Sequence, residues 1–161
     1  MIRAKTFFLS AALIALGSTG IAQKSCFARE YSADHMGKNP NQVVKSIAIR
    51  FEGPANDKSS VGEWGDVTAY FNDTSTKFTQ TLYCQVIDGK QWCGVECDGG
   101  GAEITWKDRD TILIKTKSFI MSGGCDGSET DMWFVKDLNA KFTTYRVNHT
   151  SMDACPPLDA Q

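Results

Sequence analysis

The stretch CQVIDGKQWC, residues 84–93, places two cysteines at equal distances from the dipeptide Asp88-Gly89. Asp-Gly between two β-prone runs is a strong signal for a two-residue hairpin loop of type I′. Counting outward from that loop brings Cys84 opposite Cys93 in a non-hydrogen-bonded pair. Such a pair holds its Cα atoms about 4.5 Å apart, within the range that a disulfide tolerates. The stretch therefore predicts a β-hairpin closed by a Cys84–Cys93 bridge, worth about 2.7 kcal/mol in the chain-entropy model.

Alternation of apolar and polar residues continues on both sides of this hairpin. Period two over short segments is typical of half-buried antiparallel strands, and turn residues separate the segments. The residues expected to face inward are Ile47, Ile49 and Phe51; Val67, Ala69 and Phe71; Leu82, Cys84 and Val86; Cys93, Val95 and Cys97; Ala102, Ile104 and Trp106; Ile112 and Ile114; Met132 and Phe134; and Phe142 and Thr144. The chain is thus predicted to be all-β, with about eight antiparallel strands in a meander that closes into a small barrel or flattens into a sandwich.

One segment near the start of this β domain has the signals of a helix. Ser32 suits the N-cap position, Gly37 is a natural C-terminal breaker, and Pro40 prevents continuation. We therefore expect one short N-terminal helix of one or two turns.

The first 22 residues have the pattern of a secretory signal peptide. Arg3 and Lys5 precede an apolar run from Phe7 to Gly17, which is too short to span a bilayer, and small residues end at Ala22. Residues 23–161 then form a single disulfide-bonded β domain, and we expect it to be periplasmic or secreted without membrane insertion. Cleavage leaves 15 basic residues against 19 acidic ones, a charge of −4. This mild acidity argues against nucleic acid and favours a cationic protein or envelope component as partner.

All six cysteines lie in the predicted mature domain, which indicates three disulfides in an oxidising compartment. With Cys84–Cys93 fixed, we favour Cys97–Cys125, which precede two Asp-Gly turns, and Cys26–Cys155, which lie near the chain ends. The alternative is Cys93–Cys97 with Cys84–Cys125. The C-x-x-x-C spacing of Cys93 and Cys97 lacks a second pair of the kind that a zinc site needs, so neither a metal nor another cofactor is predicted.

Candidate catalytic groups are scattered, and the sequence does not favour an enzyme. His35 and His149 are the two histidines, and no nucleophile motif accompanies them. Acidic pairs at Glu96 and Asp98 and within residues 129–131 stand in turn-rich sequence. Residues 126–131, DGSETD, gather oxygen donors but lack the spacing of a calcium-binding EF-hand loop. A hydrolase of envelope polymers that uses such a carboxylate with His35 is kept as an alternative.

Two aromatic residues flank the stapled cysteines. Tyr83 and Trp92 alternate with Cys84 and Cys93, so an inward bridge turns both rings outward. Exposed tyrosine and tryptophan side chains are typical of protein contact surfaces, although cross-strand stacking for local stability is the more common explanation. We therefore name Tyr83 and Trp92 as a candidate contact surface.

Two further stretches, CFAREYSADHMGKNPNQVV from Cys26 and CGVECDGGG from Cys93, carry a resemblance. They resemble a family of small exported, cysteine-bridged bacterial proteins of unknown function, through Cys26, Arg29, Tyr31, His35, Pro40, Gln42, Val44 and residues 93–101. In size, bridges and strand number the chain is also similar to the periplasmic lysozyme inhibitors. The first resemblance implies export to the cell envelope and no particular function. Because the chain is heavily disulfide-bonded and lacks a catalytic constellation, we expect an exported, non-catalytic β-barrel protein of the cell envelope with a binding or protective role. The second resemblance implies inhibition of a muramidase.

Overall fold

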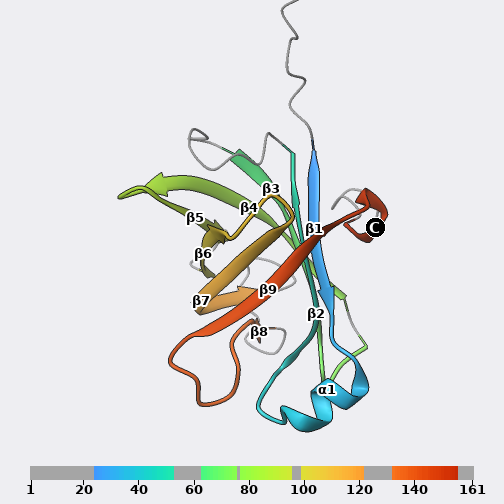
Figure 1. Cartoon of the computed structure of the whole chain (residues 1–161). Helices are drawn as coiled ribbons and strands as arrows, with labels where there is room; N and C mark the ends of the chain where they lie inside the picture. The colour runs from blue at the N-terminus through green and yellow to red at the C-terminus, as the bar shows by residue number, and fades with distance from the viewer. Residues whose placement is uncertain (1–23, 53–62, 76, 96–98, 122–131, 156–161) are drawn as a thin grey trace, which may run out of the picture.

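The computed structural model describes residues 24–52, 63–75, 77–95, 99–121 and 132–155 of the chain. The predicted leader, residues 1–22, lies outside these ranges. The described segments form an all-β structure, a closed antiparallel barrel (Figure 1). In chain order its elements are β1 (Ser25–Glu30), α1 (Ala33–Lys38), β2 (Val44–Phe51), β3 (Glu63–Phe71), β4 (Lys77–Ile87), β5 (Lys90–Val95), β6 (Gly100–Trp106), β7 (Thr111–Met121), β8 (Trp133–Phe134), β9 (Thr143–Thr150) and the 3₁₀ turn η2 (Met152–Ala154).

Eight of the strands close into a ring, and β8 stands beside it. The sheet runs β6-β5-β4-β3-β2-β1-β9-β7, and β6 also pairs with β7, which joins the two ends of the sheet. Strand β9 pairs with residues 111–116 of β7, and β8 pairs with Ile120 and Met121 further along β7. This closure settles the predicted choice between barrel and sandwich in favour of the barrel, and it leaves the ring without an open edge.

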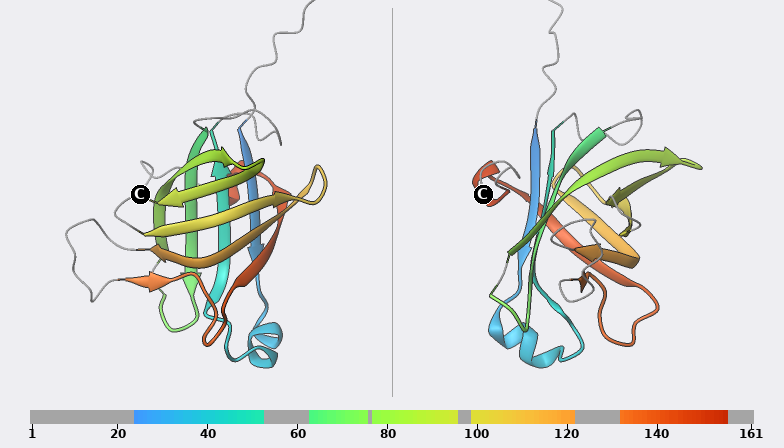
Figure 2. Two further views of the ribbon diagram at one scale, coloured as in Figure 1. Left: turned by 90° about the vertical axis from the view of Figure 1, so that its left-hand side faces the viewer. Right: turned by 180° about the vertical axis from the view of Figure 1, so that it is seen from behind.

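The barrel interior is filled by the alternating residues of its strands. Phe27, Ile49, Val67, Leu82 and Ile114 are all at most 1% exposed. The inward set predicted for residues 47–51, 67–71 and 102–104 is buried in the structure. Val86 is different, because the β4–β5 hairpin extends beyond the barrel wall (yellow-green in Figure 2) and leaves this side chain 39% exposed.

Two predicted faces are wrong by one residue. Phe134 and Phe142 were expected to face the core, but they are 49% and 47% exposed. In β9 the inward residues are instead Thr143, Tyr145 and Val147. Since side chains alternate along a strand, a shift of one residue moves every side chain to the opposite face. Burying both Tyr145 and Val147 removes more apolar surface from water than burying Phe142 alone would.

The same shift affects β8 and the residue after it. The Val135 N–H donates to Phe119 O at 2.8 Å, and the Val135 side chain is fully buried. Trp133 has the same parity and packs against the core, so Met132 and Phe134 do not form the predicted inward face.

Two disulfides lie in the described residues. Cys84 and Cys93 face each other in the ladder, with Cα atoms 4.0 Å apart, and the turn residues Asp88 and Gly89 have φ angles of 50° and 75°. Cys26 on β1 is bridged to Cys155 after η2, with Cα atoms 5.9 Å apart. Both pairings match those favoured from the sequence. Cys97 and Cys125 lie outside the described residues.

The short helix α1 connects β1 to β2 at one end of the barrel (Figure 1). Ser32 is its N-cap, and the Ser32 hydroxyl accepts the His35 N–H at 3.2 Å. Gly37 does not end the helix as expected. The helix continues to Lys38, and the Asn39 N–H closes it by donating to Met36 O at 3.1 Å.

Candidate functional site

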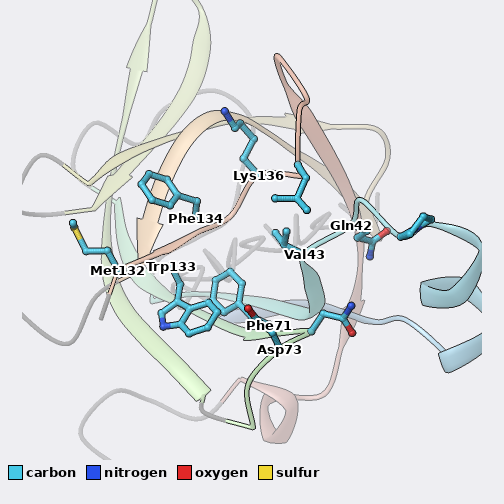
Figure 3. Close-up of a pocket in the computed structure, with 11 residues that line it drawn as sticks. Gln42, Val43, Phe71, Asp73, Met132, Trp133, Phe134 and Lys136 are labelled. Atoms are coloured by element: carbon cyan, nitrogen blue, oxygen red, sulfur yellow. The ribbon is translucent and has the colours of Figure 1, made fainter. Parts of the chain in front are cut away.

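A hollow opens at the barrel end where α1 lies. Connections that are far apart in the sequence meet there: α1 to β2, β3 to β4, and β8 to β9. Its volume is about 330 Å³, close to the lower limit of pockets that hold small molecules. We call it the mouth hollow, and it is lined by Pro40, Gln42, Val43, Phe71, Asn72, Asp73, Met132, Trp133, Phe134, Lys136 and Leu138 (Figure 3).

The floor of the mouth hollow is aromatic. The ring centroids of Phe71 and Trp133 are 5.3 Å apart, and the Phe78 ring lies 5.7 Å from the first and 5.5 Å from the second. Phe71 is the last residue of β3 and points inward with Val67 and Ala69. Edge-to-face and tilted ring contacts of this kind stabilise a rigid aromatic surface. The floor is therefore well suited to receive an apolar group.

The rim of the mouth hollow carries polar side chains on opposite sides. Lys136 lies at one side of the opening and Asp73 at the other (Figure 3). Neither side chain forms an ion pair with any residue in the described ranges. Gln42 adds a side-chain amide to this rim. An apolar floor with a few polar groups at the opening is the usual composition of a small-molecule site.

Hydrogen bonds fix Gln42 in place. Its Nε2 donates to Val44 O at 2.8 Å, so its Oε1 faces His35 Nε2 at 2.9 Å as the acceptor. The His35 ring in turn stacks on the Tyr31 ring, with centroids 4.7 Å apart, and the Arg29 guanidinium lies 4.8 Å from the Tyr31 centroid. This chain of contacts joins the end of β1, α1 and the start of β2. It positions one polar group of the rim.

A second set of hydrogen bonds holds the β8–β9 connection. Tyr145 donates its hydroxyl to Asp137 Oδ1 at 3.1 Å, and the Leu138 N–H donates to Asn41 O at 2.9 Å. Burial, and then the neighbouring Asp137 carboxylate, raise the pKa of Tyr145 well above its ordinary value of 10. Burial also raises the pKa of Tyr31, and Arg29 partly opposes this. Both hydroxyls are therefore neutral hydrogen-bonding groups at pH 7, not bases.

Five of the residues behind the family resemblance gather at this end of the barrel, whereas Cys26 and residues 93–95 lie elsewhere. Arg29, Tyr31, His35, Pro40 and Gln42 all belong to the contacts just described or to the rim. The sequence did not identify the floor or Lys136 as parts of a site. The only signal in the sequence was that Trp133 and Val135 alternate with Met132 and Phe134 and so lie on the opposite face. The prediction placed Met132 and Phe134 on the inward face instead.

The predicted contact residues lie elsewhere, on the outer wall. Tyr83 is 53% exposed and Trp92 is 37% exposed, on the face opposite the Cys84–Cys93 bridge. Trp64, which is 51% exposed, stands directly across from Tyr83 on β3. We call these three residues the outer aromatic face. Trp64 was not part of the predicted contact surface, although it has the same strand parity as the exposed Tyr70.

Among the described residues, the candidate catalytic groups do not come together at one place. His35 belongs to α1, whereas His149 pairs with Phe27 near the start of β1, away from that helix. The hydrogen-bond partner of His35 Nε2 is an amide oxygen. Glu96, Asp98 and residues 126–131 lie outside the described residues. Within the described ranges, no three His, Cys, Asp or Glu side chains are grouped as metal ligands would be.

Comparison of the chain with protein-family models, with curated proteins and with solved structures found no match. The two resemblances noted in the sequence therefore stay predictions. Two disulfides are typical of a protein that matures in an oxidising compartment. In the part of the chain that the structure describes, no helix has the length and apolar character to cross a bilayer.

Proposed function

We propose that this chain is an exported, non-catalytic β-barrel protein of the cell envelope that binds a small ligand in the mouth hollow. The observation that carries the proposal is the open, aromatic-floored hollow at the barrel end. Eight-stranded barrels have interiors just wide enough to be filled by side chains or to hold one small ligand. Here side chains fill the middle of the barrel, and the space for a ligand is at the mouth.

A binding role suits the chemistry of the polar groups at this end. Asp137 and Tyr145 are hydrogen-bonded to each other, and His35 is held by Gln42. A general base needs access to a substrate proton, and these contacts occupy the groups that would serve. They support positioning of a ligand and not its turnover.

The uncharged fluorescent probe N-phenyl-1-naphthylamine tests the binding site. We expect a saturable rise in its emission with the unchanged protein. Val43→Phe or Met132→Trp should abolish it by filling the hollow, and Val86→Phe at the far hairpin, a matched gain of aromatic volume, should leave it unchanged. Circular dichroism checks that each variant is folded. Lack of saturable binding by the unchanged protein, or binding that survives both filling variants, would overturn the proposal.

Export is a separate part of the proposal and needs its own measurement. The leader pattern and the two bridges support it. N-terminal sequencing of the protein expressed with its full leader should begin at Gln23. Recovery of the uncleaved chain with free thiols would refute export.

A second candidate function is protein binding through the outer aromatic face, favoured by the exposure of Trp64, Tyr83 and Trp92. A cationic muramidase is the partner that the mild acidity of the chain suggests. Lysozyme activity measured with micromolar protein tests this version, and we expect Tyr83→Ser with Trp92→Ser to relieve any inhibition. Unchanged lysozyme activity in the presence of the unchanged protein would eliminate it.

A further inference from the structure

The charges around the mouth hollow indicate what kind of ligand it takes. Of the residues that line it, Lys136 and Asp73 are the two that carry charge, and they lie on opposite sides of the opening (Figure 3). Between them are the aromatic floor and the Val43 side chain. A ligand that satisfies this arrangement has an apolar body with a negative group at one end and a positive group at the other.

Two other charged side chains at this end of the barrel have partners within the protein. Asp137 accepts the Tyr145 hydroxyl at 3.1 Å, and Lys38 is paired with Asp34 at 2.8 Å. Neither Lys136 nor Asp73 has such a partner among the described residues. The mouth hollow therefore offers a ligand one cation and one anion, and neither sign dominates.

We propose that the ligand is a short apolar peptide with free termini, whose carboxylate faces Lys136 and whose ammonium group faces Asp73. This inference rests on the proposed function, because it names the ligand class of the same hollow. Apolar side chains of the peptide contact Phe71 and Trp133, and its backbone amide lies within reach of the polar rim. A singly charged amphiphile satisfies one side of the opening and leaves the other unpaired.

Matched ligands separate the two charges. Leucyl-phenylalanine is compared with its N-acetyl form, its C-terminal amide and the doubly blocked form, each by displacement of N-phenyl-1-naphthylamine at pH 7. Ion pairs at partly exposed sites contribute modestly, so we expect each blocked terminus to weaken binding about threefold to fivefold. The doubly blocked form should be the weakest ligand.

Variants of the two rim residues assign each charge to its terminus. Lys136→Met should remove the advantage of a free carboxylate and keep that of a free ammonium group, and Asp73→Asn should do the reverse. Lys136→Arg should keep both advantages. Lys117→Met and Asp88→Asn, outside the lining of the hollow, are the charge-matched controls and should change nothing.

Each outcome supports or overturns the inference. If the doubly blocked dipeptide displaces the probe as well as the free one, or if only one charge matters, the dipolar ligand is wrong while the binding site stands. If the probe itself does not bind the unchanged protein, the proposed function fails as well, so the two failures are distinguishable.

Discussion

The β4–β5 hairpin and the barrel mouth are held together in different ways. The hairpin is stapled by a covalent bond between residues nine positions apart, on either side of a two-residue turn. The mouth is held by a hydrogen bond between segments far apart in the chain, Leu138 N–H to Asn41 O, and by the shorter-range bond from the Tyr145 hydroxyl to Asp137. One region is therefore specified locally, and the other depends on the register of the whole barrel. The proposed binding site lies in the second.

Removing the terminal bridge is expected to have the largest effect, because it acts on both regions. The double variant Cys26→Ala with Cys155→Ala removes a disulfide between residues 129 positions apart. In the chain-entropy model this bridge stabilises the fold by about 5 kcal/mol. That loss is comparable with the whole stability of many domains. Urea unfolding followed by tryptophan fluorescence measures it. If this variant lost less free energy of unfolding than the variant without the Cys84–Cys93 bridge, that result would contradict the entropic account.

Removing the hairpin bridge should separate the two regions. Cys84→Ala with Cys93→Ala is expected to lower the free energy of unfolding by about 2.7 kcal/mol, since a ten-residue loop is released. The mouth lies at the other end of the barrel, so probe binding there should be unchanged. Combined urea unfolding and probe titration check both statements. Loss of binding in a folded variant would show that the regions are coupled.

High pH should weaken the mouth first. The pKa values of Tyr145 and Tyr31 are raised in the folded protein, so the unfolded chain ionises first as the pH passes about 10. Their contribution is complete below pH 10 and falls above it, by about 1.4 kcal/mol per pH unit for Tyr145. Tyr145→Phe should cost about 1 kcal/mol at pH 7 through its lost hydrogen bond and make the alkaline decline shallower. Tyr70→Phe on the exposed wall is the control.

The smallest expected effect belongs to the hairpin turn. Gly89 has φ of 75° and no atom within 4 Å of an added Cβ, so Gly89→Ala meets backbone strain and no clash. The cost is about 1 kcal/mol. Gly37→Ala in α1 also meets open space, and there the change should stabilise by about 0.5 to 1 kcal/mol. Thermal melts of both variants give the comparison. Equal shifts would mean that the positive φ is not maintained in solution.

These two regions also explain what the sequence could predict. The hairpin pairing, the turn and the facing cysteines follow from ten consecutive residues. The all-β class followed from repeated alternation, which left the choice between barrel and sandwich open. The face of β9 was wrong because Phe142 and Tyr145 have opposite parities, and the partner of Tyr145 is an aspartate in a loop. The floor contact between Phe71 on β3 and Trp133 on β8 depends on five successive strand pairings in either direction around the ring, which local patterns do not contain.

Closure of the ring by β1 and β9 has a consequence for the order of events during synthesis. Strand β1 is made first, and its partners at Asn148 to Thr150 are made last. Until then β1 keeps one edge unpaired, which is a template for pairing with other chains. Contacts between the chain ends also form slowly, because the loop that they close is long. Tyr145 lies on the same strand, so the anchor of the mouth is made after every other described strand of the barrel.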